Sequence, residues 1–266
     1  MELISSAKNP KIKTLKELWS SSKFRLSERA FVVEGRRELQ HALEGGFTPR
    51  TVFFCPDIPG AAELAQEAAP AEALVPISAN VYESVAMRGS SEGLVAVMEM
   101  GRDRRLEDVV LPPAALILVA ENIEKPGNIG ALLRTADACR ADLVILCDCP
   151  TDLYNPNIIR SSLGGIFTCP VLECSSARAI EWLAAKGVKI LTAQLQDSSP
   201  YYDVDMTGPT AIVLGAEATG LTEAWRKASG AKILIPMLGR LDSLNVSISG
   251  AVLMYEAVRQ RMSAKK

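Results

Sequence analysis

The sequence predicts an α/β fold whose larger part is a parallel β-sheet covered by helices. Apolar runs of strand length alternate with helix-like runs along most of the 266-residue chain. In the C-terminal part these apolar runs are nearly continuous, as in ALILVA (115–120) and TAIVLG (210–215), which is typical of strands buried on both faces. Polar and glycine-containing segments follow several of these strands. Because ligands of parallel sheets bind at the carboxyl ends of the strands, these segments are the first place to look for a site.

Residues 1–101 are predicted to form a smaller α/β domain. It begins with a helix over 8–19. In the alternation that follows, Gly45-Gly46 marks a helix end and Pro59-Gly60 marks a helix start. The alternating runs are FVVE (31–34), RRELQHALEGG (36–46), TVFFC (51–55), AAELAQEA (61–68), LVPIS (74–78), VYESVA (81–86) and LVAVMEM (94–100).

A charged segment that ends in two prolines, RDRRLEDVVLPP (102–113), is predicted to link this domain to a second one over 114–266. The alternation of strands and helices resumes in the second domain. Predicted strands lie at 115–120, 142–147, 169–174, 188–194, 210–215 and 231–237, and predicted helices at 129–139, 155–164, 177–187, 221–229 and 243–262.

The composition is that of a soluble globular protein, with 48% hydrophobic and 23% charged residues. The N-terminus, MELISSAKNPKIK, lacks the apolar core of a signal peptide. The longest apolar run, near 111–120, contains two prolines and is too short for a membrane span of about 20 residues. We therefore expect a cytoplasmic protein with no membrane partner. The six cysteines include no CxxC pair and the one histidine, His41, lies far away in sequence, so we expect reduced thiols and no metal.

The charge is unevenly distributed along the chain. The formal net charge is −2, but residues 1–50 hold ten Lys and Arg residues against six Glu residues. This segment therefore carries +4 and the remainder −6. A basic N-terminal region on an acidic body slightly favours RNA or DNA as a partner over a merely solvated helix face.

The most unusual segment is IPMLGRLDSLNVSISG (235–250), which connects a predicted strand to the last predicted helix. Uncharged polar residues alternate in it with apolar ones: Ser243, Asn245, Ser247 and Ser249 interleave with Leu244, Val246 and Ile248. A solvent-exposed loop needs no such apolar partners, and a plain core needs no amides and hydroxyls. A pocket that recognises a ligand through hydrogen bonds needs both, so we predict a binding pocket here.

The segment LGAEATGL (214–221) contains the nearest match to the glycine-rich fingerprint of dinucleotide-binding folds. Glu217 takes the place of the middle glycine, where its carboxylate would repel a pyrophosphate, and the chain has no Walker lysine pattern. A phosphate-binding dehydrogenase is therefore disfavoured. A nucleoside-like cofactor without phosphates, of which S-adenosylmethionine is one, suits the segment better.

The third segment, PGNIGALLRTADA (126–138), carries Asn128 and Arg134. Gly127 and Gly130 predict a tight loop that a helix follows. On this helix Arg134 shares a face with small residues, so that a substrate or another backbone can approach closely. A guanidinium in this setting suits a phosphate or a carboxylate.

Together, PGNIGALLRTADA, LGAEATGL and IPMLGRLDSLNVSISGAVLMYEA resemble, in order and spacing, the three sequential motifs of the SpoU-type RNA 2′-O-ribose methyltransferases of the SPOUT superfamily. The N-terminal KNPKIKTLKELWSSSKFRLSERAFVVEGRRELQHAL is similar to the substrate-binding domain that many members place before the catalytic one. The resemblance implies an S-adenosylmethionine-dependent RNA methyltransferase that works as a homodimer, with a deep trefoil knot in its C-terminal domain. It implies ribosomal RNA as the favoured substrate and transfer RNA as the alternative.

The resemblance also implies a set of site residues. The cofactor is expected to lie in the knot and to be held mainly by backbone groups, at Leu214, Gly215, Ile235, Met237 and Leu244. The catalytic and substrate-positioning set is expected to be Asn128, Arg134, Glu217, Ser243 and Asn245.

The residues leave several alternatives open. Arg134 is either an unusually perturbed general base or a clamp for phosphate and ribose, with Glu217 or a phosphate oxygen accepting the proton. Glu217 alternatively serves the N-terminus of the helix near 221, and Ser243 and Asn245 alternatively cap the last helix. A non-catalytic RNA-binding protein that retains the fold is the alternative to an enzyme, and the intact polar set argues against it.

Overall fold

The structure, a computed structural model, describes residues 2–87, 92–101 and 104–264. Contacts within the chain divide it into two compact units. The first consists of Met1–Arg102 together with Asp152–Thr168, and the second of Asp103–Thr151 together with Cys169–Lys266. The chain therefore passes from one unit to the other three times.

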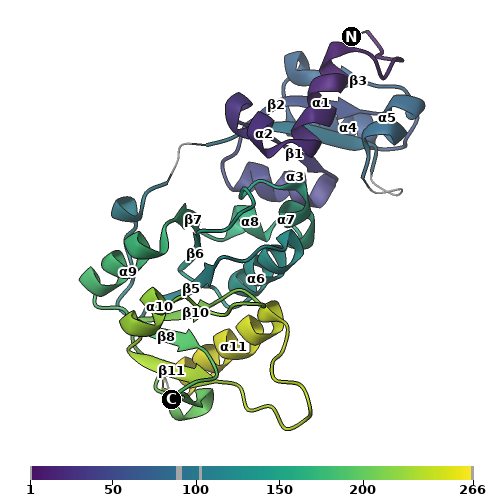
Figure 1. Ribbon diagram of the computed structural model, residues 1–266. Helices are drawn as coiled ribbons and strands as arrows, with labels where there is room; N and C mark the ends of the chain where they lie inside the picture. The colour runs from purple at the N-terminus through teal and green to yellow at the C-terminus, as the bar shows by residue number, and fades with distance from the viewer. Residues whose placement is uncertain (1, 88–91, 102–103, 265–266) are drawn as a thin grey trace. The chain divides into compact units, whose positions relative to one another are not determined.

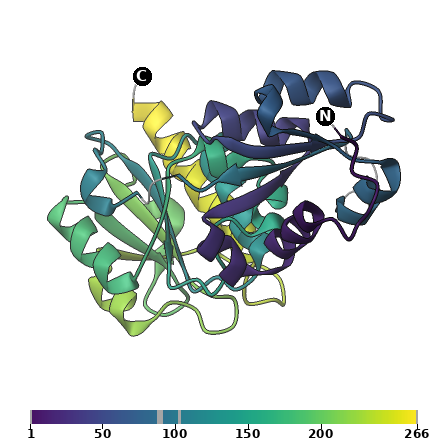
Figure 2. The ribbon, with the colours of Figure 1, turned by 90° about the horizontal axis from the view of Figure 1, so that it is seen from above.

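The first unit is built on a four-stranded sheet with strand order β1-β4-β2-β3. Strand β4 (Leu94–Glu99) runs antiparallel to β1 (Ala30–Glu34) and β2 (Pro49–Phe54), whereas β3 (Leu74–Pro76) runs parallel to β2. Helices cover both faces of this sheet (Figure 2). The helices of the unit are α1 (Pro10–Ser20), α2 (Ser22–Glu28), α3 (Arg36–Glu44), α4 (Ala61–Ala68), α5 (Ala79–Val85), α7 (Pro156–Ser161) and α8 (Gly165–Thr168), with a 3-10 turn η1 at Ala71–Ala73. Each run predicted between 8 and 100 forms a helix or a strand, whereas α2 was not predicted.

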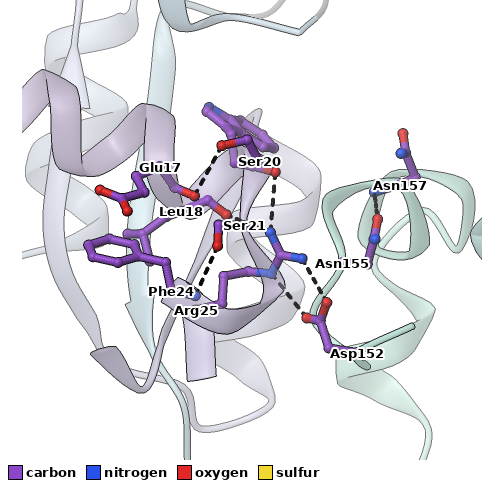
Figure 3. Close-up of polar contacts among 10 residues, drawn as sticks. Glu17, Leu18, Ser20, Ser21, Phe24, Arg25, Asp152, Asn155 and Asn157 are labelled. Carbon is purple, nitrogen blue, oxygen red and sulfur yellow. Dashed lines mark hydrogen bonds and ion pairs between the residues drawn. The ribbon is translucent and has the colours of Figure 1, made fainter. Parts of the chain in front are cut away.

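A buried ion pair joins α2 to the segment that precedes α7. The side chains of Arg25 and Asp152 are 2% and 7% exposed. The guanidinium donates to both carboxylate oxygens, from Nε to Oδ1 at 3.0 Å and from Nη2 to Oδ2 at 2.6 Å (Figure 3). Its Nη1 donates to the backbone oxygens of Leu18 and Trp19 near the end of α1. All three nitrogens of the guanidinium are therefore used inside the unit. Arg25 was counted among the cations of the basic N-terminal region, but it does not belong to an exposed basic surface.

Aromatic side chains tie the same segment to the sheet of the first unit. Tyr154 stacks on Phe31 of β1 with ring centroids 4.4 Å apart. Phe167 of α8 contacts Phe31 and Phe47, at centroid distances of 5.7 and 5.2 Å. Residues 152–168, which the sequence places inside the range 114–266, thus pack as part of the first unit.

The second unit is built on a seven-stranded sheet with strand order β7-β6-β5-β10-β8-β11-β9, and its neighbouring strands are parallel, as predicted. Its strands are β5 (Leu116–Glu121), β6 (Leu143–Cys147), β7 (Val171–Cys174), β8 (Lys189–Ala193), β9 (Ser199–Pro200), β10 (Thr210–Leu214) and β11 (Ala231–Leu234). Its helices are α6 (Pro126–Ala138), α9 (Ser176–Ala185), α10 (Glu223–Ala228) and α11 (Val246–Ala264), with 3-10 turns η2 (Leu106–Asp108) and η3 (Tyr201–Asp203). Strand β10 comes late in the chain but lies between β5 and β8. Such a change in strand order leaves a crevice at the carboxyl edge of a sheet.

The central strands of this sheet are buried on both faces, which explains their nearly continuous apolar sequence. Every residue of β5, β6 and β10 is buried. Helices α9 and α10 cover one face, where Trp182 and Trp225 enter the core. Helix α11, drawn in yellow in Figure 1, packs against α6, β5 and β10. The prediction of a parallel sheet covered by helices is confirmed.

Two predicted helix starts are wrong, each by three residues. Helix α6 begins at Pro126, so PGNIG (126–130) is the start of the helix and not a tight loop before it. Proline is favourable at the first helical position because its missing N–H has no helical partner there, and buried residues such as Ile129 hold this turn against the sheet. Helix α11 begins at Val246 and not near 243, because Asn245 caps it with its side chain.

Candidate active site

A cleft of about 540 Å³ opens at the carboxyl ends of β8, β10 and β11 in the second unit. Small-molecule sites have volumes of roughly 300–1,000 Å³. The segments that follow these three strands form its walls, together with the first turns of α11. All five residues predicted to bind the cofactor line this cleft: Leu214, Gly215, Ile235, Met237 and Leu244. Their contact with a cofactor stays a prediction.

The turn after β10 is closed so tightly that one of its positions has no room for a side chain. A Cβ on Gly215 would lie 2.4 Å from the carbonyl carbon of Gly220 and 2.5 Å from the nitrogen of Leu221. Ala216 and Gly220 form a β-bridge across the turn, and Gly220 has a φ of +67°, in the left-handed region that favours glycine. The turn thereby presents its backbone to the cleft.

Three polar residues from the three sequence segments meet beside this cleft. Asn128 Nδ2 donates to Glu217 Oε1 at 3.0 Å, and Asn245 Nδ2 donates to the same oxygen at 2.7 Å. Asn245 Nδ2 also lies 3.2 Å from Asn128 Oδ1. The structure thus brings together three of the five residues predicted to be catalytic, from α6, from the turn after β10 and from the start of α11.

The carboxylate of Glu217 accepts hydrogen bonds from several donors. Lys125 Nζ donates to its Oε2 at 2.7 Å, and the backbone N–H of Val246 also donates to the carboxylate. The pKa of Glu217 is lowered below its ordinary value, chiefly by the hydrogen bond from Lys125, with a smaller effect from Asn128. The pKa of Lys125 is raised in return, mainly by its hydrogen bond to Glu217. Glu217 is therefore ionised at neutral pH.

Asn245 both caps α11 and contacts Glu217. Its Oδ1 accepts the backbone N–H of Ser247 at 3.0 Å and the hydroxyl of Ser247 at 2.6 Å, as expected for an N-cap of α11. Its Nδ2 then points to Glu217, so the cap fixes which side of the amide faces the carboxylate. Ser243 lines the cleft and is exposed, and it does not cap α11.

The alternative role considered for Glu217, at the N-terminus of the helix near 221, is wrong. The carboxylate instead accepts the backbone N–H of Val246 at the start of α11 and the side-chain amide of Asn245. The acid that serves α10 is Glu121 at the end of β5, which accepts the backbone N–H of Thr222 at 2.8 Å and its hydroxyl at 2.6 Å. Glu121 is 1% exposed, and a sequence pattern does not reveal this long-range contact.

Arg134 stands apart from the other predicted residues. It lies six residues beyond Asn128 on α6, which corresponds to about 9 Å along a helix axis. Its side chain is exposed and does not line the cleft. Within the described part of the chain it forms no hydrogen bond and no ion pair, so its five N–H donors are available to a ligand outside the chain.

Two cations at the site were missed by sequence reasoning. Lys125 precedes α6 and pairs with Glu217, and Arg226 of α10 lines the cleft. The proline that follows Lys125 marks it as the residue before a helix start, which is the one local signal for its position. Arg226 has no such local signal, because its position in the cleft wall depends on the turn that brings α10 beside the cleft.

The composition of the cleft fits a nucleoside-like cofactor. Leu214, Ile235 and Leu244 supply apolar walls, and the close turn at Gly215 supplies backbone groups.

Within residues 2–87, 92–101 and 104–264 no group of three or more His, Cys, Asp or Glu side chains is placed to hold a metal ion. None of the helices in these ranges combines the length and apolar character needed for a membrane span.

Comparison with known families divides the chain in two. Residues 115–255 match the SpoU rRNA Methylase family. Residues 9–96 match the MRM3-like substrate binding domain. The two matches together span most of the chain.

Relatives and solved structures agree with these matches. The chain is 28% identical over 257 residues to the 23S rRNA (guanosine(2553)-2′-O)-methyltransferase RlmP of Bacillus subtilis (strain 168), covering 96% of this chain and 98% of the relative. It is 29% identical to the 23S rRNA (uridine(2479)-2′-O)-methyltransferase of Streptomyces viridochromogenes, with 98% and 93% covered. The crystal structure of AdoMet-bound rRNA methyltransferase from Sinorhizobium meliloti superposes with a TM-score of 0.87 at 27% identity, covering 97% of each chain.

Proposed function

The chain belongs to the SpoU rRNA Methylase family, and we propose that it transfers a methyl group from S-adenosylmethionine to a ribose 2′-hydroxyl of ribosomal RNA. One observation carries this proposal. Three segments far apart in sequence bring Asn128, Glu217 and Asn245 within hydrogen-bond distance of one another beside a cleft of about 540 Å³. A carboxylate and two amides can orient a hydroxyl group, and the cleft has room for the methyl donor at the same edge of the sheet.

When bound, S-adenosylmethionine supplies a methyl group on a positively charged sulfonium. The side chains of Leu214, Ile235 and Leu244 are positioned to exclude water from the adenosine, and the backbone at Gly215 is positioned to hydrogen-bond it. Glu217 places a negative charge in the wall of the cleft, because its pKa is lowered by Lys125. This charge suits a cationic cofactor and opposes one that binds through phosphates.

Glu217 is poorly suited to accept the proton of the ribose hydroxyl. Its oxygens already accept hydrogen bonds from Lys125, Asn128 and Asn245, which leaves neither oxygen free for the hydroxyl proton. We assign it the positioning of the two amides. Arg134 acts as a clamp on phosphate and ribose, with a phosphate oxygen of the RNA as the proton acceptor.

We also propose that the second unit contains the trefoil knot that the resemblance implies. The chain leaves β11 through residues 235–245, which form no helix or strand, and returns as α11 against α6, β5 and β10. Strand β10, which precedes β11 in the sequence, lies between β5 and β8 in the sheet. The C-terminal helix thus packs against the middle of the sheet, although the strands on either side of β10 come earlier in the chain. This return supports the proposal that the C-terminal segment passes through a loop of the chain.

A homodimer is proposed as the working form. Helix α11 exposes Ile248, Tyr255 and Met262, which are 53%, 51% and 67% exposed. Because they are spaced by seven residues, they share one face of the helix and form an apolar stripe that a second copy can cover. Light scattering should give twice the chain mass of 28.6 kDa. A folded monomer at working concentration would contradict an assembled site.

The first unit is proposed to bind the RNA substrate, as its match to a substrate-binding domain supports. In this proposal residues 1–101 form the substrate-binding domain, with residues 152–168 packed in the same unit, residues 102–113 form the linker, and residues 114–266 form the methyltransferase domain. Exposed cations lie on its helices: Lys11 and Lys13 on α1, Lys23 on α2, and Arg36 and Arg37 on α3. Binding through such residues should weaken as salt concentration rises, because counterions are released from the phosphates.

The decisive experiment measures transfer of a labelled methyl group from S-adenosylmethionine into purified 23S rRNA and into transfer RNA, both from cells that lack this protein. We expect label in the ribosomal RNA at a 2′-O position, detected as a site resistant to alkaline cleavage. Asn128→Ala and Asn245→Ala should lose the activity while keeping the fold. Label in transfer RNA alone would contradict the ribosomal substrate. Tight binding of S-adenosylmethionine and RNA without transfer would favour the non-catalytic alternative.

A further inference from the structure

We infer that Arg226 binds the carboxylate of the amino-acid end of S-adenosylmethionine. This inference rests on the proposed function, because it assigns a role in binding the same cofactor. None of the three sequence segments contains Arg226, and the residues expected to hold the cofactor are apolar or act through the backbone. Arg226 therefore adds a charged contact at the end of the cofactor that these residues leave unexplained.

The position of Arg226 is fixed by the turn that forms one wall of the cleft. Helix α10 begins directly after this turn, and Trp225, which is fully buried, anchors the helix in the core. Arg226 follows Trp225 and lines the cleft with a half-buried side chain. Its Nε donates to the backbone oxygen of Leu221 at 3.0 Å, so the plane of the guanidinium is held by the turn itself.

The guanidinium lies beside the same turn that carries Gly215 and Glu217. A Cβ on Gly220 would lie 3.7 Å from Arg226 Nη2. Within the described part of the chain, Nη1 and Nη2 donate to no carboxylate, and Arg226 forms no ion pair. One of its five N–H donors is thus used for orientation, and the pair of donors that recognises a carboxylate is left for a ligand.

The charges around the cleft are arranged for a ligand with both signs. Among the described residues that line the cleft, Arg226 is the one cation, whereas Glu217 and Asp242 are the acids. Glu217 is already paired with Lys125, so it does not neutralise Arg226. S-adenosylmethionine carries a sulfonium, an ammonium and one carboxylate. Its carboxylate is the one anionic group. A half-buried guanidinium without an ion-pair partner can form a strong, charge-assisted pair of hydrogen bonds with it.

The test compares S-adenosylmethionine with its decarboxylated analogue, which keeps the adenosine, sulfonium and amine but lacks the carboxylate. Calorimetric titration gives the affinity of each for the full-length protein. We expect the wild-type protein to bind the decarboxylated analogue about tenfold more weakly, as for loss of a hydrogen-bonded charged group at a partly exposed site. Arg226→Gln should lose about tenfold in affinity for S-adenosylmethionine and change its affinity for the analogue by less than about twofold.

A matched control is available on the same helix. Lys227 is exposed, follows Arg226 directly and does not line the cleft, so Lys227→Gln should leave both affinities unchanged. Arg226→Lys keeps the charge but loses the planar pair of donors, and it should fall between wild type and Arg226→Gln. Thermal unfolding of each variant shows whether the fold is kept. The wild-type comparison of the two ligands needs no variant, so a folding defect cannot hide the answer.

The outcomes separate this inference from the proposed function. Equal affinities of the wild-type protein for both ligands would overturn the role of Arg226 while leaving the methyltransferase proposal standing. Equal losses for both ligands in Arg226→Gln would show that the residue shapes the cleft and does not bind the carboxylate. An unchanged cofactor affinity with weakened RNA binding would assign Arg226 to an RNA phosphate and overturn the inference. Failure of the wild-type protein to bind either ligand would overturn the proposed function itself.

Discussion

At the scale of single residues, the candidate site is organised around a carboxylate that stays ionised and holds two amides. Glu217 receives hydrogen bonds from Asn128 and Asn245, and each amide comes from the start of a different helix. The oxygen of Asn245 is used to cap α11, which leaves its nitrogen for Glu217. The sequence motifs contain all three residues, and the structure brings them together. Lys125 was not predicted, because its importance depends on a contact with a residue 92 positions away.

Replacing Lys125 with Met should raise the pKa of Glu217 toward the ordinary value for a glutamate. Lys125 is the largest cause of the lowered pKa. Because the pKa is lower in the folded than in the unfolded chain, the pairing stabilises the fold at neutral pH, and this stabilisation is lost as the pH falls through the folded-state pKa. Titration of the side-chain carboxyl carbon by NMR measures the shift. Lys227→Met, which removes an exposed lysine on α10, is the matched control, and an unchanged pKa in Lys125→Met would contradict the pairing.

Arg134→Lys tests the clamp at the same scale. Lysine keeps the positive charge but loses the planar set of donors that can hold phosphate and ribose in one geometry. Because proximity and orientation carry much of the proposed catalysis, we expect methyl transfer to fall about 100-fold or more. The affinity for S-adenosylmethionine should stay unchanged, since Arg134 does not line the cleft. Turnover close to that of the wild-type protein at neutral pH would rule out a clamp that depends on the guanidinium.

At the scale of elements, six of the seven strands of the second unit were predictable, whereas the short strand β9 and the start of α6 were not. Strands buried on both faces leave continuous apolar runs, and β5 and β10 show this clearly. The start of α6 contains two glycines, which are poor helix formers, so local propensity favours a loop. The helix forms because Ile129 and Leu132 are buried against its neighbours, a contribution that local sequence does not show.

At Gly250, α11 approaches α6 and β10 closely, so this residue tests the packing. A Cβ there would lie 2.5 Å from Leu132 Cδ2 and 2.9 Å from Leu214 Cδ1. Gly250→Leu should therefore destabilise the fold by about 1–3 kcal/mol through overpacking, and should weaken cofactor binding because Leu214 lines the cleft. Urea unfolding measures the first effect and calorimetric titration the second.

Gly127→Ala is the control for this substitution. Gly127 also lies in a helix, but a Cβ there meets no atom within 4 Å. Alanine is a better helix former by up to about 1 kcal/mol, so this variant should be as stable as the wild-type protein or slightly more stable. A Gly250→Leu variant as stable as Gly127→Ala would contradict close packing at Gly250, because both substitutions improve helix propensity.

At the scale of the whole molecule, the division of the chain into units was the least visible feature in the sequence. Residues 152–168 lie between β6 and β7 in sequence and read as an ordinary connecting helix, yet they pack with the first unit. The contact that anchors them joins Arg25 to Asp152, 127 residues apart. Periodicity and turn signals report only local structure, so a pairing over this separation leaves no trace that one sequence can reveal.

The Arg25–Asp152 pair provides a test of whether residues 152–168 belong to the first unit. The test uses the cost of leaving one buried charge without its partner. Arg25→Met leaves Asp152 buried without its partner, so we expect the first unit to lose about 3–5 kcal/mol of unfolding free energy. The double variant Arg25→Met/Asp152→Leu removes both charges and should recover most of that loss, since the cost lies in the unpaired charge. Urea unfolding of the full chain measures both values. Arg50→Met, which removes an exposed cation paired with Glu28 and Glu99, should cost less than about 1 kcal/mol. A double variant no more stable than Arg25→Met would mean that α2 and the segment before α7 depend on the geometry of the ion pair and not on the neutralisation of its charges.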